Sequence, residues 1–375
     1  MRSSFLNHTK IVGAAAGLAV MLIGCASRPT EAVLTPVKLG AAPAQEVTLI
    51  AATNRASSPN GSGYGGEWAS ALSFERFQFS VPANRDGTKI AYPDARPDPQ
   101  RQYFITQRDE LTTENFVGAI THAPAFDGSV AVFVHGYNNS FQEAVYRTAQ
   151  MAADVNSRSP PVLFSWPSAA SVMGYVADRD GALYSRSELG QVLVALARSP
   201  RINRIELVSH SMGAFLSMEV VRQLRLQGRS ETLDKLQIVL ASPDIDVDVF
   251  RSQLLDIGKM STPITLLVSK SDRALVVSSF LARKRERVGK VDVYDPVIVE
   301  AARAERLRVV DITSLQSVDG LGHDRFATFA RYADQLAQNE TQDSNSLAGA
   351  GAFVFDAAGA AVSSPFRLAS RIARP

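Results

Sequence analysis

The sequence predicts an α/β fold with a mostly parallel central sheet, antiparallel N-terminal strands and helices on both faces. Continuous Val, Ile and Leu runs that alternate with helical periods are typical of parallel strands buried on both faces. Such runs occur at 130–134, 162–164, 205–208, 236–240, 264–268 and 307–310. Strand-like runs separated by turns precede them at 47–52, 74–81 and 103–106, and these predict the antiparallel part. Small and polar residues follow most of the parallel runs, and such sheets bind ligands beyond the carboxyl ends of their strands.

The N-terminus has the features of a secretory signal. Arg2 and Lys10 precede and flank an apolar stretch over 11–23 that is too short to span a bilayer. The four residues L-I-G-C that end at Cys25 resemble the lipobox of bacterial lipoproteins, in which the cysteine is lipidated and the preceding peptide is removed. We therefore expect a lipoprotein signal peptide over 1–24 and lipidation of Cys25. An ordinary signal peptide with a small buried cysteine is the alternative.

Charge and cysteine content limit the possible partners. The two basic residues of 1–24 leave 39 − 2 = 37 basic against 37 acidic side chains, a balance that gives no reason to expect nucleic acid. Cys25 is the only cysteine, and the histidines are scattered, so we expect no metal site and no cofactor. A lipidated chain would be anchored to a membrane without spanning it. Ala26, in place of the aspartate associated with inner-membrane retention, favours the outer membrane of a bacterial envelope.

Composition divides the rest of the chain. Residues 25–45 are rich in Pro, Ala and Thr and are expected to form a flexible tether. The α/β domain is expected over 46–340, and 341–375, rich in Ala, Gly and Ser, is expected to be a low-complexity tail. The basic run over 283–287 is expected to be a solvated helix face, with contact to anionic lipid headgroups as the alternative.

The segment I-E-L-V-S-H-S-M-G, residues 205–213, predicts a nucleophile elbow at Ser211. An apolar strand ends in small residues, Ser209 and Gly213 flank Ser211 at two-residue spacing, and a helix-forming run over 214–224 follows. The turn is so tight that a bulky side chain at a flanking position would collide with the neighbouring strand and helix, so glycine is usual there. Ser209 replaces the first of these glycines. A serine cap on an ordinary helix is the alternative.

Elimination leaves His323 as the general base. His122 precedes the repeating strands, and the histidine of the signal is removed with it. His135 is expected to hold its own loop, and His210 is expected to point to the other side of the elbow. His323 lies in a glycine-rich loop after the last apolar run and just before a predicted helix, where a hydrolase with the chain order Ser, Asp, His needs its histidine.

Two aspartates compete for the third catalytic position. Asp272 follows the run at 264–268 and is the expected acid, because hydrolases of this chain order place the carboxylate after the strand next to the last. A carboxylate there would orient His323 and stabilise the imidazolium that forms. Asp244, after the run at 236–240, is the alternative acid, although we expect it to cap the following helix.

With these residues in place, the chain resembles the α/β-hydrolase superfamily, and within it a bacterial group of esterase/lipase-like hydrolases. The resemblance covers about 47–337 and implies the α/β-hydrolase fold. Serine commonly stands at the position of Ser209 in this group. The resemblance rests on seven blocks in the expected order: Thr53-Asn54-Arg55, H-G-Y-N-N-S from His135, F-S-W-P-S from Phe164, S-H-S-M-G from Ser209, A-S-P-D-I-D from Ala241, S-D-R-A-L from Ser271 and G-H-D-R-F from Gly322.

The loop after 130–134 is expected to supply half of an oxyanion hole. Gly136 permits a turn that points backbone amides outward, and in α/β-hydrolases one amide of this loop acts together with that of the residue after the nucleophile. We assign these roles to the amides of Tyr137 and Met212. Ser140, with Glu143 three residues later, predicts a capping box at the start of the next helix.

The expected function is that of a serine hydrolase that cleaves carboxylic esters through an acyl-enzyme on Ser211. A small or medium acyl ester is the expected substrate. Trp166 is expected either to pack in the core or to line the substrate pocket. Two other functions stay open: a catalytically silent binding or scaffolding lipoprotein of the same fold, and an acyltransferase or peptidase with the same triad. Survival of all three triad residue types in order favours turnover.

Overall fold

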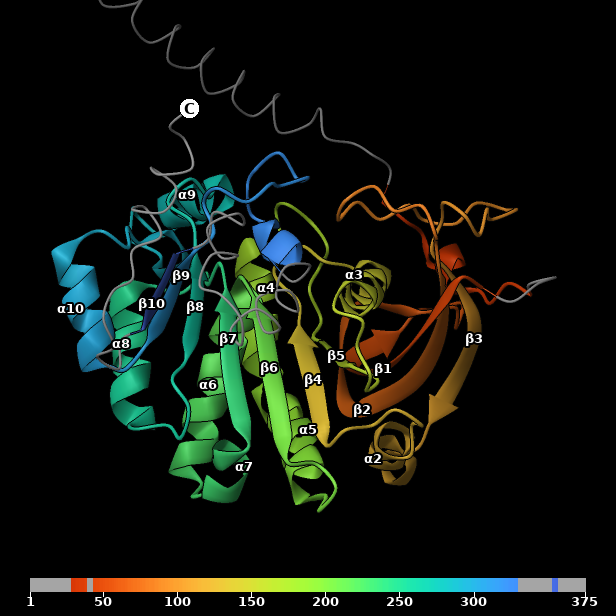
Figure 1. Ribbon diagram of the computed structural model, residues 1–375, viewed down its shortest axis with the longest axis horizontal. Coiled ribbons are helices and arrows are strands. Elements are labelled where there is room, and N and C mark those ends of the chain that lie inside the picture. The colour runs from red at the N-terminus through yellow and green to blue at the C-terminus, as the bar shows by residue number, and fades with distance from the viewer. Residues whose placement is uncertain (1–27, 39–42, 330–352, 357–375) are drawn as a thin grey trace, which may run out of the picture.

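A single sheet runs through the centre of the molecule (Figure 1). The computed structural model describes residues 28–38, 43–329 and 353–356. Its strands are β1 (Gln45–Ser57), β2 (Tyr64–Val81), β3 (Phe104–Leu111), β4 (Ser129–Val134), β5 (Val162–Ser165), β6 (Arg204–His210), β7 (Leu236–Ala241), β8 (Thr265–Val268), β9 (Arg308–Asp311) and β10 (Phe353–Asp356). They form a ten-stranded sheet in the order β10-β9-β8-β7-β6-β4-β5-β1-β2-β3.

The strand directions confirm the predicted division of the sheet. Seven strands, β1 and β4 to β9, run parallel to one another. At one edge β2 pairs antiparallel with both β1 and β3. β1 joins the two parts, because it pairs antiparallel with β2 and parallel with β5. The carboxyl ends of the parallel strands therefore meet at one edge of the sheet, as the sequence predicts.

Helices cover both faces of the sheet. They are α2 (Thr113–Thr121), α3 (Phe141–Asp154), α4 (Tyr175–Tyr184), α5 (Arg186–Arg198), α6 (Met212–Leu226), α7 (Ser230–Asp234), α8 (Val247–Ile257), α9 (Arg273–Leu281) and α10 (Pro296–Ala304), with 3-10 turns η1 (Glu31–Leu34) and η2 (Val288–Lys290). The predicted capping box opens α3: Glu143 N–H donates to Ser140 Oγ at 3.3 Å, and Ser140 N–H donates to Glu143 Oε2 at 2.8 Å.

The core lies in two layers, one on each face. Alternate residues of a strand point to opposite faces, so Val132 and Val134 of β4 pack with the α5, α6 and α8 side, whereas Phe133 packs with the α3 side. This two-sided burial is what the continuous apolar runs predict. The α/β-hydrolase fold expected for the chain is therefore the observed one.

The expectation of a flexible tether over 25–45 is wrong for residues 28–38. Leu34 of η1 is fully buried and Val33 is 8% exposed. The Tyr146 hydroxyl donates to the Val33 carbonyl at 2.7 Å, and Val37 N–H donates to the Ile105 carbonyl at 2.8 Å. Apolar side chains within the Pro- and Ala-rich segment have joined the core, so the folded part begins before residue 46. The predicted signal peptide and Cys25 lie outside the described residues.

The C-terminal region also adds to the sheet. Within the segment 341–375, expected to be a low-complexity tail, β10 pairs antiparallel with β9 in the register Phe353 to Asp311. The chain is helical from Arg325 to Phe329, directly after His323, as predicted for the start of that helix. Among the residues that the structure describes, no helix is both long and apolar enough to cross a membrane.

Candidate active site

Ser211 stands in a strained turn between β6 and α6. Its backbone has φ 54° and ψ −119°, a conformation that L-residues rarely adopt and that costs roughly 1–3 kcal/mol. The neighbouring chain holds it there, because Ser211 N–H donates to the Ala241 carbonyl at 2.9 Å and Asp244 N–H donates to the Ser211 carbonyl at 3.2 Å. The turn lies at the carboxyl end of β6, the position that the strand, turn and helix pattern predicts for a nucleophile.

Two glycines allow the elbow and the β4 loop to pack closely. A Cβ on Gly213 would lie 2.3 Å from the His135 carbonyl oxygen and 2.7 Å from that of Val134. A Cβ on Gly136 would lie 2.8 Å from His210 Nδ1 and 2.9 Å from Ser211 Cβ. Real Cβ atoms do not approach other atoms this closely, so both positions exclude any side chain. The loop with the predicted oxyanion residue therefore lies directly against Ser211.

Ser209 occupies the position where the elbow usually has its first glycine. Its side chain is fully buried, and its hydroxyl is 2.6 Å from the hydroxyl of Ser217 on α6. A hydroxymethyl group fits because it finds a hydrogen-bond partner on the helix.

His323 forms a hydrogen bond with Asp272. His323 Nδ1 lies 2.7 Å from Asp272 Oδ2, and the aspartate is fully buried. The other oxygen, Asp272 Oδ1, accepts from Leu275 N–H at 3.0 Å and caps α9. Burial of the imidazole disfavours its protonation, but the Asp272 carboxylate, together with Asp319 and Asp244, outweighs this effect and raises the pKa of His323 above its usual value.

His210 supports the His323 loop, so the expectation that it points to the other side of the elbow is wrong. The two rings lie 4.5 Å apart between centroids, and His210 Nε2 is 3.1 Å from the His323 carbonyl oxygen. Phe326 also stacks on the His210 ring, with 4.2 Å between the ring centroids. Burial and the neighbouring His323 hold the pKa of His210 well below its usual value, so His210 is neutral and donates to that carbonyl.

Because His210 adjoins Ser211, its contacts bring the His323 loop to the nucleophile. Among the described contacts, none is a hydrogen bond between Ser211 Oγ and the His323 ring.

Asp244, the alternative acid, has other partners. Its carboxylate lies 3.1 Å from Arg287 Nε and accepts hydrogen bonds from the hydroxyls of Ser278, at 2.8 Å, and Tyr175, at 2.9 Å. The structure thus brings His323 to Asp272 and leaves Asp244 with Arg287. The expectation that Asp244 caps the next helix is wrong, because Asp246 caps α8 by accepting from the amides of Asp248 and Val249.

The basic run over 283–287 is not a helix face. α9 ends at Leu281, before the run, and Arg287 is only 2% exposed. Arg285 pairs with Asp246 at 2.6 Å. Arg287, which the sequence predicts to be a solvated charge, is instead the buried counterion of Asp244.

The amides predicted for the oxyanion hole are those of Tyr137 and Met212. Met212 is the first residue of α6, where an N–H has no intrahelical acceptor. Among the described residues neither amide has a backbone or side-chain acceptor. Asn139 Nδ2 donates to the Tyr137 carbonyl at 3.0 Å, and Asp178 Oδ2 accepts from the Asn138 amide at 3.0 Å. These bonds fix the loop with its free amide beside Ser211.

Arg55 holds the same loop from inside the protein, a role that was not predicted. Its guanidinium is 1% exposed and donates to three carbonyl oxygens at 2.8–3.0 Å: those of Gly65, Ser168 and Asn139. Burial lowers its pKa to about 9, against the opposing influence of Asp178 and Glu143. The sequence signal was a charged residue shortly after the apolar run at 47–52, within the Thr53-Asn54-Arg55 block.

His135 and Trp166 form a stacked pair behind the loop. With its proton on Nδ1, the His135 ring donates to the Gly136 carbonyl at 2.8 Å, and burial together with Arg55 lowers its pKa to about 3. It therefore stays neutral and holds the loop, as expected. The Trp166 indole is fully buried, stacks on His135 at 4.9 Å and donates to its carbonyl at 2.8 Å. Of the two roles expected for Trp166, core packing is the one that agrees with its full burial.

Comparison with known proteins gives the family. The family model described as "Alpha/beta hydrolase of unknown function (DUF900)" matches residues 112–339, more than half of the chain. The chain belongs to this alpha/beta hydrolase family. No curated protein matches the sequence.

Two solved structures are similar to this hydrolase. Est1E from Butyrivibrio proteoclasticus is 11% identical with a TM-score of 0.34, and the match covers 59% of this chain and 91% of Est1E. A protein of Agrobacterium vitis S4 named as a hydrolase is 12% identical with a TM-score of 0.33, and the match covers 72% and 95% of the two chains. At TM-scores this low neither likeness adds to the assignment.

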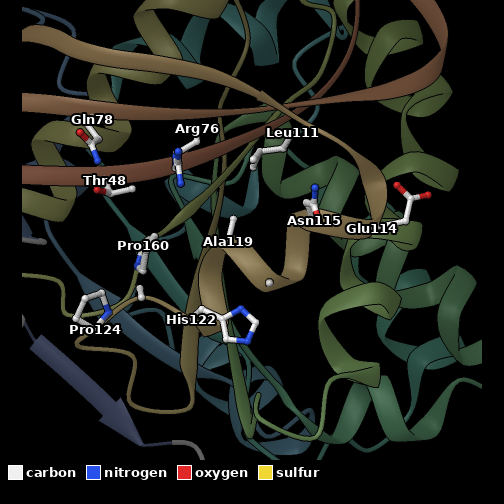
Figure 2. Close-up of a pocket in the computed structure, with 12 residues that line it drawn as sticks. Thr48, Arg76, Gln78, Leu111, Glu114, Asn115, Ala119, His122, Pro124 and Pro160 are labelled. Carbon is white, nitrogen blue, oxygen red and sulfur yellow. The ribbon is translucent and has the colours of Figure 1, made fainter.

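One hollow of the hydrolase lies away from the candidate site. It has a volume of about 670 Å³ and lies between α2 and the strands β1 and β2 (Figure 2). Arg76, Gln78 and His122 are among its lining residues. None of these elements carries a predicted catalytic residue. Among the described residues no group of three His, Cys, Asp or Glu side chains could hold a metal ion.

Proposed function

We propose that this hydrolase cleaves carboxylic esters with Ser211 as the nucleophile. The observation that carries the proposal is the strained Ser211 elbow, packed against the loop of His323, which is itself hydrogen-bonded to Asp272. A serine at such a turn, a histidine and a buried carboxylate are the three parts that acyl transfer requires.

In the proposed reaction Ser211 Oγ attacks the ester carbonyl and His323 Nε2 takes its proton. The amides of Met212 and Tyr137 donate to the oxyanion of the tetrahedral intermediate. His323 then returns the proton to the departing alcohol, which leaves an acyl group on Ser211. Water attacks this ester by the same route and releases the acid. Asp272 holds the tautomer of His323 and stabilises its charged form.

The raised pKa of His323 supports this assignment. A base that must accept a proton from a serine works best when its conjugate acid has a pKa near the operating pH, and Asp272 raises the pKa of His323 from its usual value. Only a short loop, from Trp166 to Gly174, separates β5 from α4 near the site, so we propose small or medium acyl esters as substrates.

We further propose that the hydrolase is a lipoprotein of the bacterial envelope. The support is the lipobox-like sequence L-I-G-C at Cys25, after a basic and then apolar leader. The absence of an aspartate after the cysteine supports the outer membrane as its location.

A fluorophosphonate probe tests the proposal, because it labels an activated serine without knowledge of the substrate. The chain from Ala26 onward would be used, so that the protein carries no lipid. We expect labelling of the wild type and its loss in Ser211→Ala and in His323→Ala.

Ser209→Ala is the matched control, because it removes a serine two residues away that bonds only to α6 among the described residues. We expect this variant to label like the wild type. A folded wild type that is not labelled would overturn the proposal and favour a binding protein that has kept the fold.

A further inference from the structure

Five large apolar side chains stand exposed on one rim of the hydrolase. Those of the loop and helix around α4 are 62%, 90% and 75% exposed, and those at the end of α9 are 71% and 59% exposed. We call them the docking face: Val172, Met173, Val176, Phe280 and Leu281. Four of them line one groove of about 510 Å³ between α4 and α9. Contiguous apolar surface of this kind marks an interaction site rather than the ordinary surface of a soluble protein.

The docking face lies beside the candidate active site. The hydroxyl of Tyr137, the predicted oxyanion residue, donates to the Val172 carbonyl. The ring of Tyr175, which lines the same groove, lies 5.4 Å from that of Tyr137 in an edge-on arrangement. Asp272 caps the start of α9, which ends at Leu281, so one helix joins the proposed acid to the docking face.

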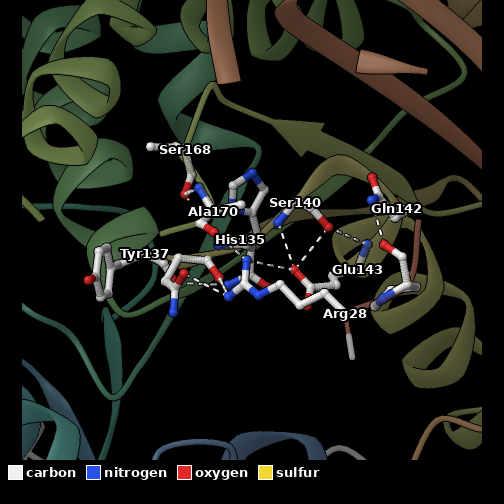
Figure 3. A network of polar contacts seen from close by, with 12 residues as sticks. Arg28, His135, Tyr137, Ser140, Gln142, Glu143, Ser168 and Ala170 are labelled. Carbon is white, nitrogen blue, oxygen red and sulfur yellow. Dashed lines mark hydrogen bonds and ion pairs between the residues drawn. The ribbon is translucent and has the colours of Figure 1, made fainter. Parts of the chain in front are cut away.

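The first described residues of the chain are attached to the same rim. Figure 3 shows the Arg28 guanidinium between the β4 loop and the loop before α4. It donates to the Ala170 carbonyl at 2.7 Å, and to the carbonyl and side-chain oxygens of Asn138 at 2.9 and 2.7 Å. Ala170 is two residues from Val172. The next residue is held as well, because Gln142 Nε2 donates to the Pro29 carbonyl at 2.8 Å.

Chain length then limits where a lipid on Cys25 could attach. Cys25 is three residues from Arg28. A fully extended chain rises at most about 3.6 Å per residue, so the two Cα atoms can be at most about 11 Å apart. An anchor on Cys25 would therefore leave the protein next to the docking face. This step rests on the proposed lipidation, whereas the exposed apolar side chains do not depend on it.

Basic side chains border the docking face. Arg283 and Lys284 follow Leu281 closely, both are exposed, and neither forms an ion pair with another described residue. Exposed apolar residues flanked by unpaired cations suit a surface of anionic lipid headgroups over an apolar layer.

We propose that the docking face binds a phospholipid bilayer that contains anionic lipids, and so presents the candidate active site to the membrane on which Cys25 is anchored. The apolar side chains enter the layer between headgroups and acyl chains, and Arg283 and Lys284 meet the headgroups. The alternative role noted for the basic run in the sequence thus applies to the exposed Arg283 and Lys284.

Co-flotation with vesicles tests this proposal. The chain from Ala26 onward, which lacks the lipid, would be mixed with vesicles of phosphatidylcholine and phosphatidylglycerol at a ratio of about 7:3. We expect the wild type to float, and the bound fraction to fall at least about tenfold in Met173→Asp/Phe280→Asp, since two apolar contacts are replaced by charges that anionic headgroups repel. Pure phosphatidylcholine vesicles should bind the wild type more weakly.

Leu226→Asp is the matched control. Leu226 is 65% exposed but ends α6 next to α7, at the opposite end of the sheet (Figure 1). It should leave flotation unchanged. A wild type that floats with neither kind of vesicle would overturn the proposal. So would equal losses of flotation in Met173→Asp/Phe280→Asp and in Leu226→Asp.

Fluorophosphonate labelling of the same samples without vesicles tests hydrolysis separately from membrane binding. The variant Met173→Asp/Phe280→Asp should label at the wild-type rate. A chain that floats but is not labelled would contradict the proposed hydrolysis alone.

Discussion

The loops after β7 and β8 each carry a buried aspartate, but the two aspartates have different partners. Each follows a parallel strand and carries a buried aspartate, 3% exposed for Asp244 and fully buried for Asp272. Asp272 faces a histidine at 2.7 Å, whereas Asp244 faces an arginine at 3.1 Å. A histidine can gain and lose a proton at neutral pH, but an arginine cannot. The partner, rather than burial or position after a strand, therefore separates a candidate catalytic acid from a structural one.

The strongest test of this difference is Asp272→Asn. Asparagine keeps the cap on α9 but cannot hold the His323 tautomer that accepts a proton from serine. We expect the rate of fluorophosphonate labelling to fall by about 10³–10⁴-fold, while thermal stability changes little. A variant that labels at the wild-type rate would remove Asp272 from the catalytic group.

Asp244→Asn should show the opposite pattern. It leaves Arg287 buried without a counterion, so we expect a loss of about 3–5 kcal/mol in the free energy of unfolding, measured in urea. The folded fraction should still label. Asp248→Asn is the control, because Asp248 is exposed and its pair with Arg285 is solvated, so its loss should change stability by less than about 0.5 kcal/mol. If Asp244→Asn unfolds no more easily than this control, the structural role is wrong.

The pH dependence of labelling should show whether Asp272 acts on His323. Only neutral His323 can accept the serine proton, and Asp272 raises the pKa of His323 above its usual value of 6.5. The labelling rate of the wild type should therefore rise with pH around a midpoint above 6.5. In Asp272→Asn the midpoint should move to lower pH, because the largest of the influences that raise the pKa of His323 is gone. Labelling rates measured across a pH series would show this shift. An unchanged midpoint would contradict the proposed action of Asp272 on His323.

The smallest effect is expected for Tyr175→Phe. It removes the 2.9 Å hydrogen bond from the tyrosine hydroxyl to Asp244 but keeps the ring. We expect a loss of about 1 kcal/mol in the free energy of unfolding. Differential scanning calorimetry beside Asp244→Asn would measure it, and a loss as large as that of the aspartate variant would show that the ion pair is not the main contribution.

Most of the sheet and the elbow could be predicted from neighbouring residues alone. The apolar runs at 205–208 and 236–240 became β6 and β7, and the small residues around Ser211 became the turn between β6 and α6. Periodicity and steric limits on the backbone act over a few residues, so they are visible in the sequence. The predicted cap at Asp244 failed for a related reason, because Asp246 two residues later has the same chemistry and a better position.

The residues that hold the loops of the candidate site in place could not be predicted from neighbouring residues. Arg55 reaches the carbonyl of Ser168, 113 residues away, and His210 meets the carbonyl of His323, also 113 residues away. Nothing in the local sequence of Arg287 indicates that it is buried. Residues 28–38 read as a tether because composition reports average polarity, whereas two buried side chains, Val33 and Leu34, hold that segment against the core.

By itself the sequence determined the α/β architecture, the order of the predicted nucleophile, acid and base along the chain, and the tight turn at Ser211. These follow from burial patterns and from the backbone, which are properties of short stretches. Only the tertiary structure decided which aspartate meets His323, which arginine lies under the loop with the predicted oxyanion amide, and where the first described residues attach. Those outcomes depend on which loops meet at the carboxyl edge of the sheet, and a buried charge takes whichever partner lies close enough to offset its loss of water.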